Sequence, residues 1–135
     1  MRLKLAMTTL AITLLLLTAL AAEAQTGDKR LSPQFAKCMA AVDLGALKNT
    51  QFEGCYRKEL AVQDQRLNEE YKKALARQTG ESRKLLTNGQ RAWLAYRDGW
   101  CGYVRTVDAA PTPEVNYVAC LVDLTAAQVQ HLRDD

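Results

Sequence analysis

The stretch Gln-Arg-Ala-Trp-Leu-Ala-Tyr-Arg-Asp-Gly-Trp-Cys, residues 90–101, decides how the rest of the chain is arranged. On a helix that turns by about 100° per residue, one side of this region carries Leu86, Gln90, Trp93, Arg97, Trp100, Cys101 and Val104. An amphipathic helix normally places only apolar residues on such a side. A buried arginine is costly unless a carboxylate meets it, so the stretch predicts an acidic partner elsewhere in the chain.

The partner is expected in a second helical segment, residues 50–78, whose apolar stripe is interrupted by Asp64. Thr79-Gly80 breaks the pattern, and the next helix is expected over residues 81–107. Two helices joined by a short turn pack antiparallel, which places Asp64 opposite Arg97. The alternative is that both side chains extend into solvent.

The same folding of the chain near residue 80 places Asn68 near Gln90 and Tyr71 near Leu86. We expect the tryptophans in the core, and Tyr96 and Tyr103 at a partly exposed flank that could form a binding surface. The predicted seam inside the hairpin consists of Asp64, Leu67, Asn68, Tyr71, Gln90, Trp93 and Arg97.

Short helices are expected at both ends of this hairpin. Ser32-Pro33 is a helix start, which predicts a helix to about residue 47, and Thr50 with Glu53 forms a capping-box pattern. Pro113 begins a short helix, and a second capping box, Thr125 with Gln128, begins another. Sustained period-2 alternation is lacking. The sequence therefore predicts an all-α fold, a small disulfide-stabilised helical bundle built on a long antiparallel helix hairpin, with short helices at each end.

The first 24 residues have the pattern of a secretory signal peptide. A positive start is followed by an apolar run and by Ala22-Glu23-Ala24, which offers small residues for cleavage. An uncleaved anchor is the alternative, but the run is short for a spanning helix of about 20 residues. We expect residues 25–135 to form a single domain that is periplasmic or secreted, soluble after signal cleavage and without a stable membrane anchor.

Four cysteines, Cys38, Cys55, Cys101 and Cys120, follow the predicted cleavage site. An even number in a small exported domain indicates two disulfides. Zinc is the alternative, but no Cys-x-x-Cys pair occurs. Three pairings are possible, and we favour the sequence-local ones, Cys38–Cys55 and Cys101–Cys120, each of which stabilises by about 3 kcal/mol in the chain-entropy model.

Charge and residue inventory exclude several function classes. The chain has 18 basic and 15 acidic residues, and removal of Arg2, Lys4 and Glu23 with the signal peptide leaves 16 and 14. Such a mild, mixed charge does not indicate a nucleic-acid partner. The lone His131 lies in a charged C-terminal segment, and no P-loop, dinucleotide or nucleophile-elbow pattern occurs. We therefore expect no enzyme activity, no metal and no cofactor.

The motif Asp64-x-x-Leu67-Asn68-x-x-Tyr71, followed by Gln90-Arg91-x-Trp93-Leu94-x-Tyr96-Arg97-Asp98-x-x-Cys101, resembles the LprI-like lysozyme inhibitor family. Its members are small exported bacterial proteins. The resemblance covers about residues 38–132 and implies an α-helical, disulfide-bonded fold and inhibition of lysozyme. One departure is Gln128, where the family often has an arginine. Another is the missing lipidation cysteine, which the founding type of the family has.

The resemblance implies a protein partner, with lysozyme as the first candidate. Such an inhibitor would occlude the sugar-binding cleft, where the catalytic carboxylates lie. The candidate contact regions are residues 77–84 and 106–116. The alternative is a periplasmic interaction module or an immunity protein that binds another envelope or toxin protein. The residues expected to contact a partner are Arg77, Arg83, Lys84, Arg91, Tyr96 and Asp98.

Overall fold

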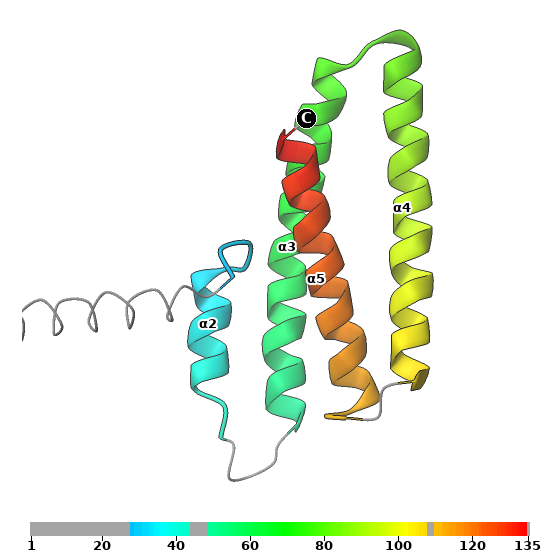
Figure 1. The fold of residues 1–135 in the computed structure, drawn as a ribbon. Helices are drawn as coiled ribbons and strands as arrows, with labels where there is room; N and C mark the ends of the chain where they lie inside the picture. Colours follow the sequence, from blue (N-terminus) through cyan, green and yellow to red (C-terminus); the bar gives the residue numbers. More distant parts are fainter. Residues whose placement is uncertain (1–27, 44–48, 108–109, 135) are drawn as a thin grey trace, which may run out of the picture.

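The computed structural model describes residues 28–43, 49–107 and 110–134. They form four helices, α2 (Pro33–Ala40), α3 (Asn49–Arg77), α4 (Gly80–Val107) and α5 (Pro113–Asp134), shown in Figure 1. No strand occurs within these ranges. The all-α prediction is confirmed. The predicted signal peptide lies outside the described residues.

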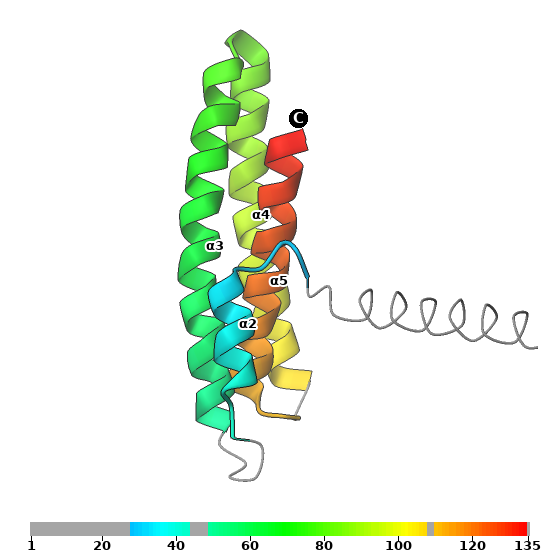
Figure 2. The ribbon, with the colours of Figure 1, turned by 90° about the vertical axis from the view of Figure 1, so that its left-hand side faces the viewer.

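The long hairpin is present, but its two arms are not packed directly on each other. α3 and α4 run antiparallel from the turn at Gln78 and Thr79, where Gly80 has a φ of 53°, a value that favours glycine. α5 lies along both arms and makes most of the contacts with each, whereas α3 and α4 contact each other little. Figures 1 and 2 show α5 beside both long helices. The expected hairpin seam is therefore confirmed only in part: Asp64 meets Arg97, and Tyr71, Leu86 and Trp93 pack against one cluster, but α5 makes most of the contacts with both arms.

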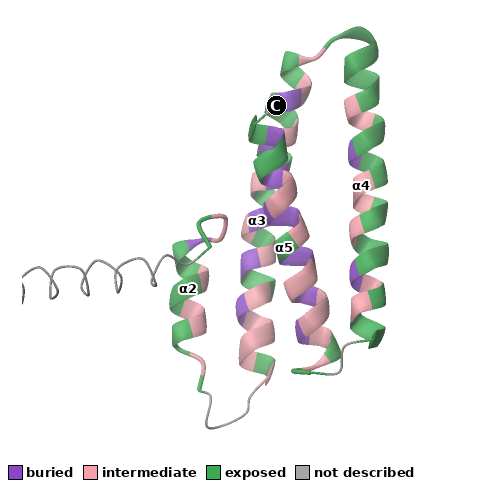
Figure 3. Cartoon of the chain, viewed as in Figure 1, coloured by how far each residue is buried: buried purple, intermediate pink, exposed green. Residues whose placement is uncertain are grey.

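The core lies where α5 meets α3. Leu67 and Ala74 of α3 pack with Val129 and Leu132 of α5, and Tyr71, Leu86 and Trp93 pack against this cluster. Burying each large aliphatic side chain stabilises the fold by about 1.5–3 kcal/mol. α5 contributes eight buried residues and α4 only two. Figure 3 shows this difference as a mostly exposed α4.

α5 is a single helix of 22 residues, so the expectation of two short helices after residue 112 is wrong. The hydroxyl of Thr125 explains the error. It lies inside the helix, fully buried, and accepts a hydrogen bond from Arg97 Nη1 at 3.2 Å instead of capping a new helix. A threonine followed by a glutamine three residues later has the capping pattern even where the hydroxyl is bound by another helix.

α2 begins where the sequence predicts and ends early. The Ser32 hydroxyl accepts a hydrogen bond from the Phe35 N–H at 3.1 Å, and Pro33 occupies the first turn. The helix ends at Ala40 rather than near residue 47; residues 44–48 are outside the described ranges. α3 is described from Asn49, one residue before the predicted start at Thr50, which agrees within the one or two residues by which helix bounds vary.

Both disulfides have the sequence-local pairing. Cys38–Cys55 joins α2 to α3, and Cys101–Cys120 joins α4 to α5. Cys101 is fully buried. The two outer helices, α2 and α4, are therefore each joined by a disulfide to one of the two helices that form the core, α3 and α5.

Candidate functional site

The predicted ion pair between Asp64 and Arg97 is present. Arg97 Nη1 lies 3.3 Å from Asp64 Oδ1, and Arg97 Nε donates to Asp98 Oδ1 at 2.9 Å. The guanidinium is 5.3 Å from the centre of the Trp93 ring, a distance typical of a cation–π contact. The Arg97 side chain is 14% exposed but that of Asp64 is 47% exposed. The pair therefore lies at the edge of the core and its carboxylate faces water.

Because the Asp64 carboxylate is half exposed, removing Arg97 should cost less stability than breaking a fully buried ion pair. We predict that Arg97→Ala reduces the free energy of unfolding by about 2 kcal/mol, because the buried Thr125 hydroxyl loses its donor. Asp64 stays solvated and adds little to this cost. Urea unfolding measures the change. The exposed Arg91→Ala on the same helix is the control and should change stability by no more than about 0.5 kcal/mol. An equally small change for Arg97→Ala would contradict the proposed packing.

The second predicted polar pair, Asn68 with Gln90, is wrong. Asn68 is exposed, whereas Gln90 is buried and its Oε1 accepts a hydrogen bond from Gln128 Nε2 of α5 at 3.0 Å. α5 supplies the partner because it lies between the arms. Gln128, at which this chain departs from the family pattern, thus donates a hydrogen bond directly to Gln90 of the motif.

A buried polar cluster that the sequence reading missed fastens α2 to α3. The Glu59 carboxyl accepts hydrogen bonds from the Ser32 N–H at 2.9 Å, from the Ser32 hydroxyl, and from Gln63 Nε2 at 2.7 Å. Glu59 is 1% exposed and Gln63 fully buried. Glu59 and Gln63 are one helical turn apart, and this spacing is the signal that could have indicated a shared polar site. The cluster is enclosed, and its hydrogen bonds join α2 and the segment before it to α3, although Gln63 Oε1 has no hydrogen-bond partner among the described residues; we assign the cluster a structural role.

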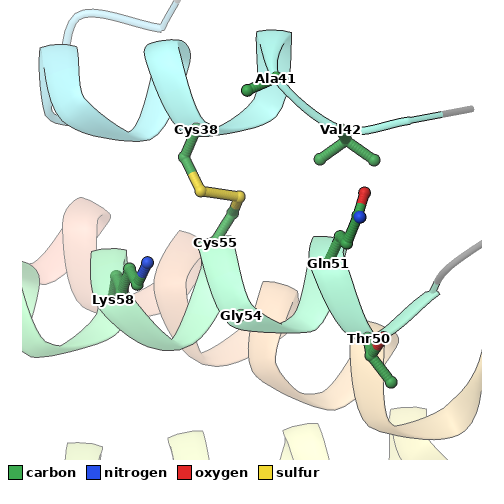
Figure 4. Close-up of a pocket in the computed structure, with 8 residues that line it drawn as sticks. All are labelled: Cys38, Ala41, Val42, Thr50, Gln51, Gly54, Cys55 and Lys58. Carbon is green, nitrogen blue, oxygen red and sulfur yellow. A yellow bond between two sulfur atoms is a disulfide. The ribbon is translucent and has the colours of Figure 1, made fainter.

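Next to this cluster, a groove of about 300 Å³ runs between α2 and the first turns of α3. Figure 4 shows the Cys38–Cys55 disulfide at one end of the groove and Val42 facing Gln51 at the other. The Asp43 N–H donates to Gln51 Oε1 at 2.9 Å. We assign the groove no ligand.

Several other carboxylates form ion pairs with exposed lysine or arginine side chains. Lys73 Nζ at 3.0 Å and Arg133 Nε at 3.4 Å lower the pKa of Glu70. Arg105 lowers the pKa of Glu114, and Arg30 lowers that of Asp28. Carboxylates with lowered pKa values are poor proton donors. In the described ranges no cluster of His, Cys, Asp and Glu could hold a metal ion.

The basic residues expected to contact a partner at the hairpin turn are used within the fold. Arg77 Nη2 donates to the Leu132 carbonyl of α5 at 3.2 Å, and Arg83 Nη1 donates to the Leu75 carbonyl of α3 at 2.6 Å. Basic side chains commonly bind the free carbonyls at helix C-termini. Lys84 is exposed beside Glu81, at 3.6 Å. The turn is therefore a poorer contact surface than its charge suggests.

A different surface has the properties of a binding site, the outer face of α4. We define it by the exposed residues Leu85, Gly89, Ala92, Tyr96, Gly99, Trp100, Tyr103 and Val107. Every large hydrophobic side chain that is exposed within the described ranges belongs to this face. The rings of Tyr96 and Trp100 are nearly parallel with centres 6.4 Å apart, and those of Trp100 and Tyr103 are 5.5 Å apart. Contiguous apolar surface of this kind marks interaction sites.

The outer face was only partly predicted. Tyr96 was expected to contact a partner and lies on this face, together with Tyr103. Trp100 was expected in the core but is 47% exposed, so that expectation is wrong. α4 carries two apolar stripes, and Trp100 belongs to the outer one, whereas Trp93 and Cys101 face α5. The spacing of four and three residues between Tyr96, Trp100 and Tyr103 is the signal for a separate stripe.

Fold and surface together define a disulfide-tied helical protein with an exposed aromatic face, a class suited to binding another macromolecule. The family model described as lysozyme inhibitor LprI matches residues 38–132, more than two thirds of the chain. The chain therefore belongs to the LprI lysozyme inhibitor family. It has no significant match among curated proteins or among solved structures. No helix in the described ranges is long and apolar enough to cross a membrane.

Proposed function

We propose that this protein is an exported inhibitor of lysozyme-type muramidases, acting without enzyme activity of its own, and that it binds the enzyme through the outer face of α4. Family membership supports the target, and the exposed rings of Tyr96, Trp100 and Tyr103 support the place of contact. Exposed tryptophan and tyrosine dominate the energetics of protein interfaces.

The surroundings of the outer face suit occlusion of a cleft. α4 is a peripheral helix whose inner side is tied to α5 through Cys101–Cys120. The backbone of the outer face is therefore already ordered before a partner binds. Binding then loses little conformational entropy. A convex helix edge that carries large rings can enter a sugar-binding cleft and exclude the glycan from the catalytic carboxylates.

Charge contributes little to this contact. The outer face carries no charged side chain from Leu85 to Val107, and the charged Arg91 and Asp98 lie on other sides of α4. The chain without its signal peptide has 16 basic and 14 acidic residues. Long-range attraction to a basic lysozyme is therefore lacking. Inhibition should be nearly independent of salt concentration.

The test mixes the chain from Gln25 onward with lysozymes of several classes and follows lysis of a bacterial cell-wall suspension. Lysis should fall in proportion to inhibitor concentration. Trp100→Ala should weaken inhibition by at least about tenfold, because it removes the central ring of the face. Lys72→Ala, exposed on α3, is the control and should inhibit like the unchanged protein.

Two results would contradict the proposal at different points. No inhibition at micromolar excess against any class of lysozyme would remove muramidases as the target and favour another envelope or toxin protein. Full inhibition by Trp100→Ala would keep the target but place the contact elsewhere on the molecule.

A further inference from the structure

The Cys38–Cys55 disulfide lies between two hollows at the junction of α2 and α3. One hollow is the groove of about 300 Å³, and the other is a smaller, more enclosed cavity of about 70 Å³. Both are lined by Cys38, Cys55 and Lys58. Figure 4 shows the disulfide joining the two helices at the wall of the groove. A small thiol can therefore approach this disulfide without prior unfolding of a helix.

The helix that this disulfide attaches is weakly packed. α2 has eight residues and contributes no buried side chain, whereas α5 contributes eight buried residues. Cys101 of the other disulfide is fully buried. A disulfide resists reduction when the surrounding fold keeps its two thiols close together after the bond has opened. Packing gives this support to Cys101–Cys120 and gives little of it to Cys38–Cys55.

The two ends of α2 are held in different ways. At the N-terminal end, the Glu59 carboxyl accepts a hydrogen bond from the Ser32 N–H at 2.9 Å and another from the Ser32 hydroxyl. Near the C-terminal end, Cys38 is bound covalently to α3. Just beyond it, the Asp43 N–H donates to Gln51 in an exposed hydrogen bond, which is a much weaker tie than a covalent bond. Opening the disulfide therefore frees the C-terminal end and leaves Ser32 as the hinge.

We infer that Cys38–Cys55 is a redox-sensitive latch on α2. A dithiol reductant opens it while Cys101–Cys120 stays closed, and the C-terminal end of α2 then moves away from α3. The latch goes beyond the proposed function and does not rest on it. The outer face of α4 belongs to the part of the fold that the closed disulfide still holds.

The positions of the two sulfur atoms determine the chemistry of opening. Cys38 is partly exposed, whereas Cys55 is 3% exposed, so the thiolate of the dithiol attacks Cys38 Sγ. The S–S bond breaks, and Cys55 leaves as a thiolate that takes up a proton. The second thiol of the dithiol then displaces Cys38 as a free thiol, and the reductant departs as a disulfide. Lys58 lies one helical turn from Cys55, and a nearby ammonium group stabilises a leaving thiolate.

The experiment exposes the oxidised chain from Gln25 onward to increasing concentrations of dithiothreitol at neutral pH. Free thiols are alkylated, and peptide mass spectrometry identifies them. Cys38 and Cys55 should be alkylated at a dithiothreitol concentration at least about tenfold lower than Cys101 and Cys120 require. At that concentration, hydrogen exchange should become faster at the amides of residues 39 and 40, at the freed end of α2, than at the amide of residue 35, beside the hinge.

Lys58→Met removes the charge and keeps a side chain of similar length. It should slow the reduction of Cys38–Cys55 by about threefold or more. Lys72→Met, also exposed on α3, is the matched control and should not change the rate. An unchanged rate in Lys58→Met would overturn the assistance by Lys58.

Simultaneous reduction of both disulfides, or earlier reduction of Cys101–Cys120, would overturn the latch itself. Selective reduction without faster exchange at residues 39 and 40 would also overturn it, because α2 would then be held in place by packing alone. These measurements use the protein without lysozyme, so a failed inhibition assay would leave their outcome unchanged.

Discussion

Replacing Glu59 with alanine should lower the free energy of unfolding by about 3 kcal/mol. The carboxyl group accepts the Ser32 N–H, the Ser32 hydroxyl and Gln63 Nε2 at a site that is 1% exposed. Without it, the Ser32 N–H is left in a dry site with no acceptor, and an unsatisfied buried donor costs about 1–3 kcal/mol. The volume of the lost side chain adds to this cost.

The effect should concentrate on α2. Ser32 caps that helix and reaches α3 through Glu59, so the amides of Phe35 and Ala36 should exchange with solvent faster in the variant. Glu59→Gln keeps one acceptor and should cost less, about 1 kcal/mol. Glu69→Ala, exposed on the same helix, is the control. If Glu59→Ala lowers the free energy of unfolding no more than Glu69→Ala does, the cluster does not hold α2 in place.

Removing the Cys101–Cys120 disulfide should destabilise the whole domain. The bond closes a segment with a sequence separation of 19, for which the chain-entropy model gives about 3 kcal/mol. Cys101 is also fully buried, so Cys101→Ala/Cys120→Ala leaves unfilled volume as well. The melting temperature should fall by about 10 °C or more, as followed by circular dichroism.

The other disulfide is the natural comparison. Cys38–Cys55 has a similar sequence separation of 17, but it attaches only the short helix α2. Cys38→Ala/Cys55→Ala should therefore loosen α2 and leave cooperative unfolding of α3, α4 and α5 largely intact. Equal losses of melting temperature for the two double variants would show that α2 is part of the same cooperative unit.

Helical periodicity was sufficient to predict the class of fold and the turn near Gly80. It could also place Asp64 near Arg97, because both residues interrupt an apolar stripe and the turn sets their register. The sequence-local disulfides followed from loop length. Each of these predictions depends on residues that are neighbours along one helix or across one turn.

The position of α5 depends on contacts of another kind. Thr125 has the pattern of a cap, and only the guanidinium of Arg97 from another helix shows that its hydroxyl is otherwise bound. Gln90 was assigned to Asn68 because two arms were assumed to touch, and the third helix changed the partner to Gln128. Glu59 was not recognised as buried, because charged residues are rarely buried and its acceptor role depends on Ser32, 27 residues away.

The outer face of α4 was predicted only in part, for a related reason. A single apolar stripe is expected on a peripheral helix, so Trp100 was assigned to the stripe that contains Trp93. The spacing of Tyr96, Trp100 and Tyr103 indicates a second stripe, but the contacts with α5 are needed to show which of the two stripes is buried. A second stripe that packs against nothing in the described ranges is itself evidence of a binding partner.

The central place of α5 has a consequence for how the protein is made. α5 is the last of the four helices along the chain, yet α3 and α4 meet mainly through it. A growing chain that has reached Val107 cannot yet bury Leu67 and Ala74 against Val129 and Leu132. The final helix therefore sets the moment at which this core can form. On the export route that we propose, a core that cannot form before the last helix is made would leave the chain unfolded for longer, which suits passage through a narrow protein-conducting channel.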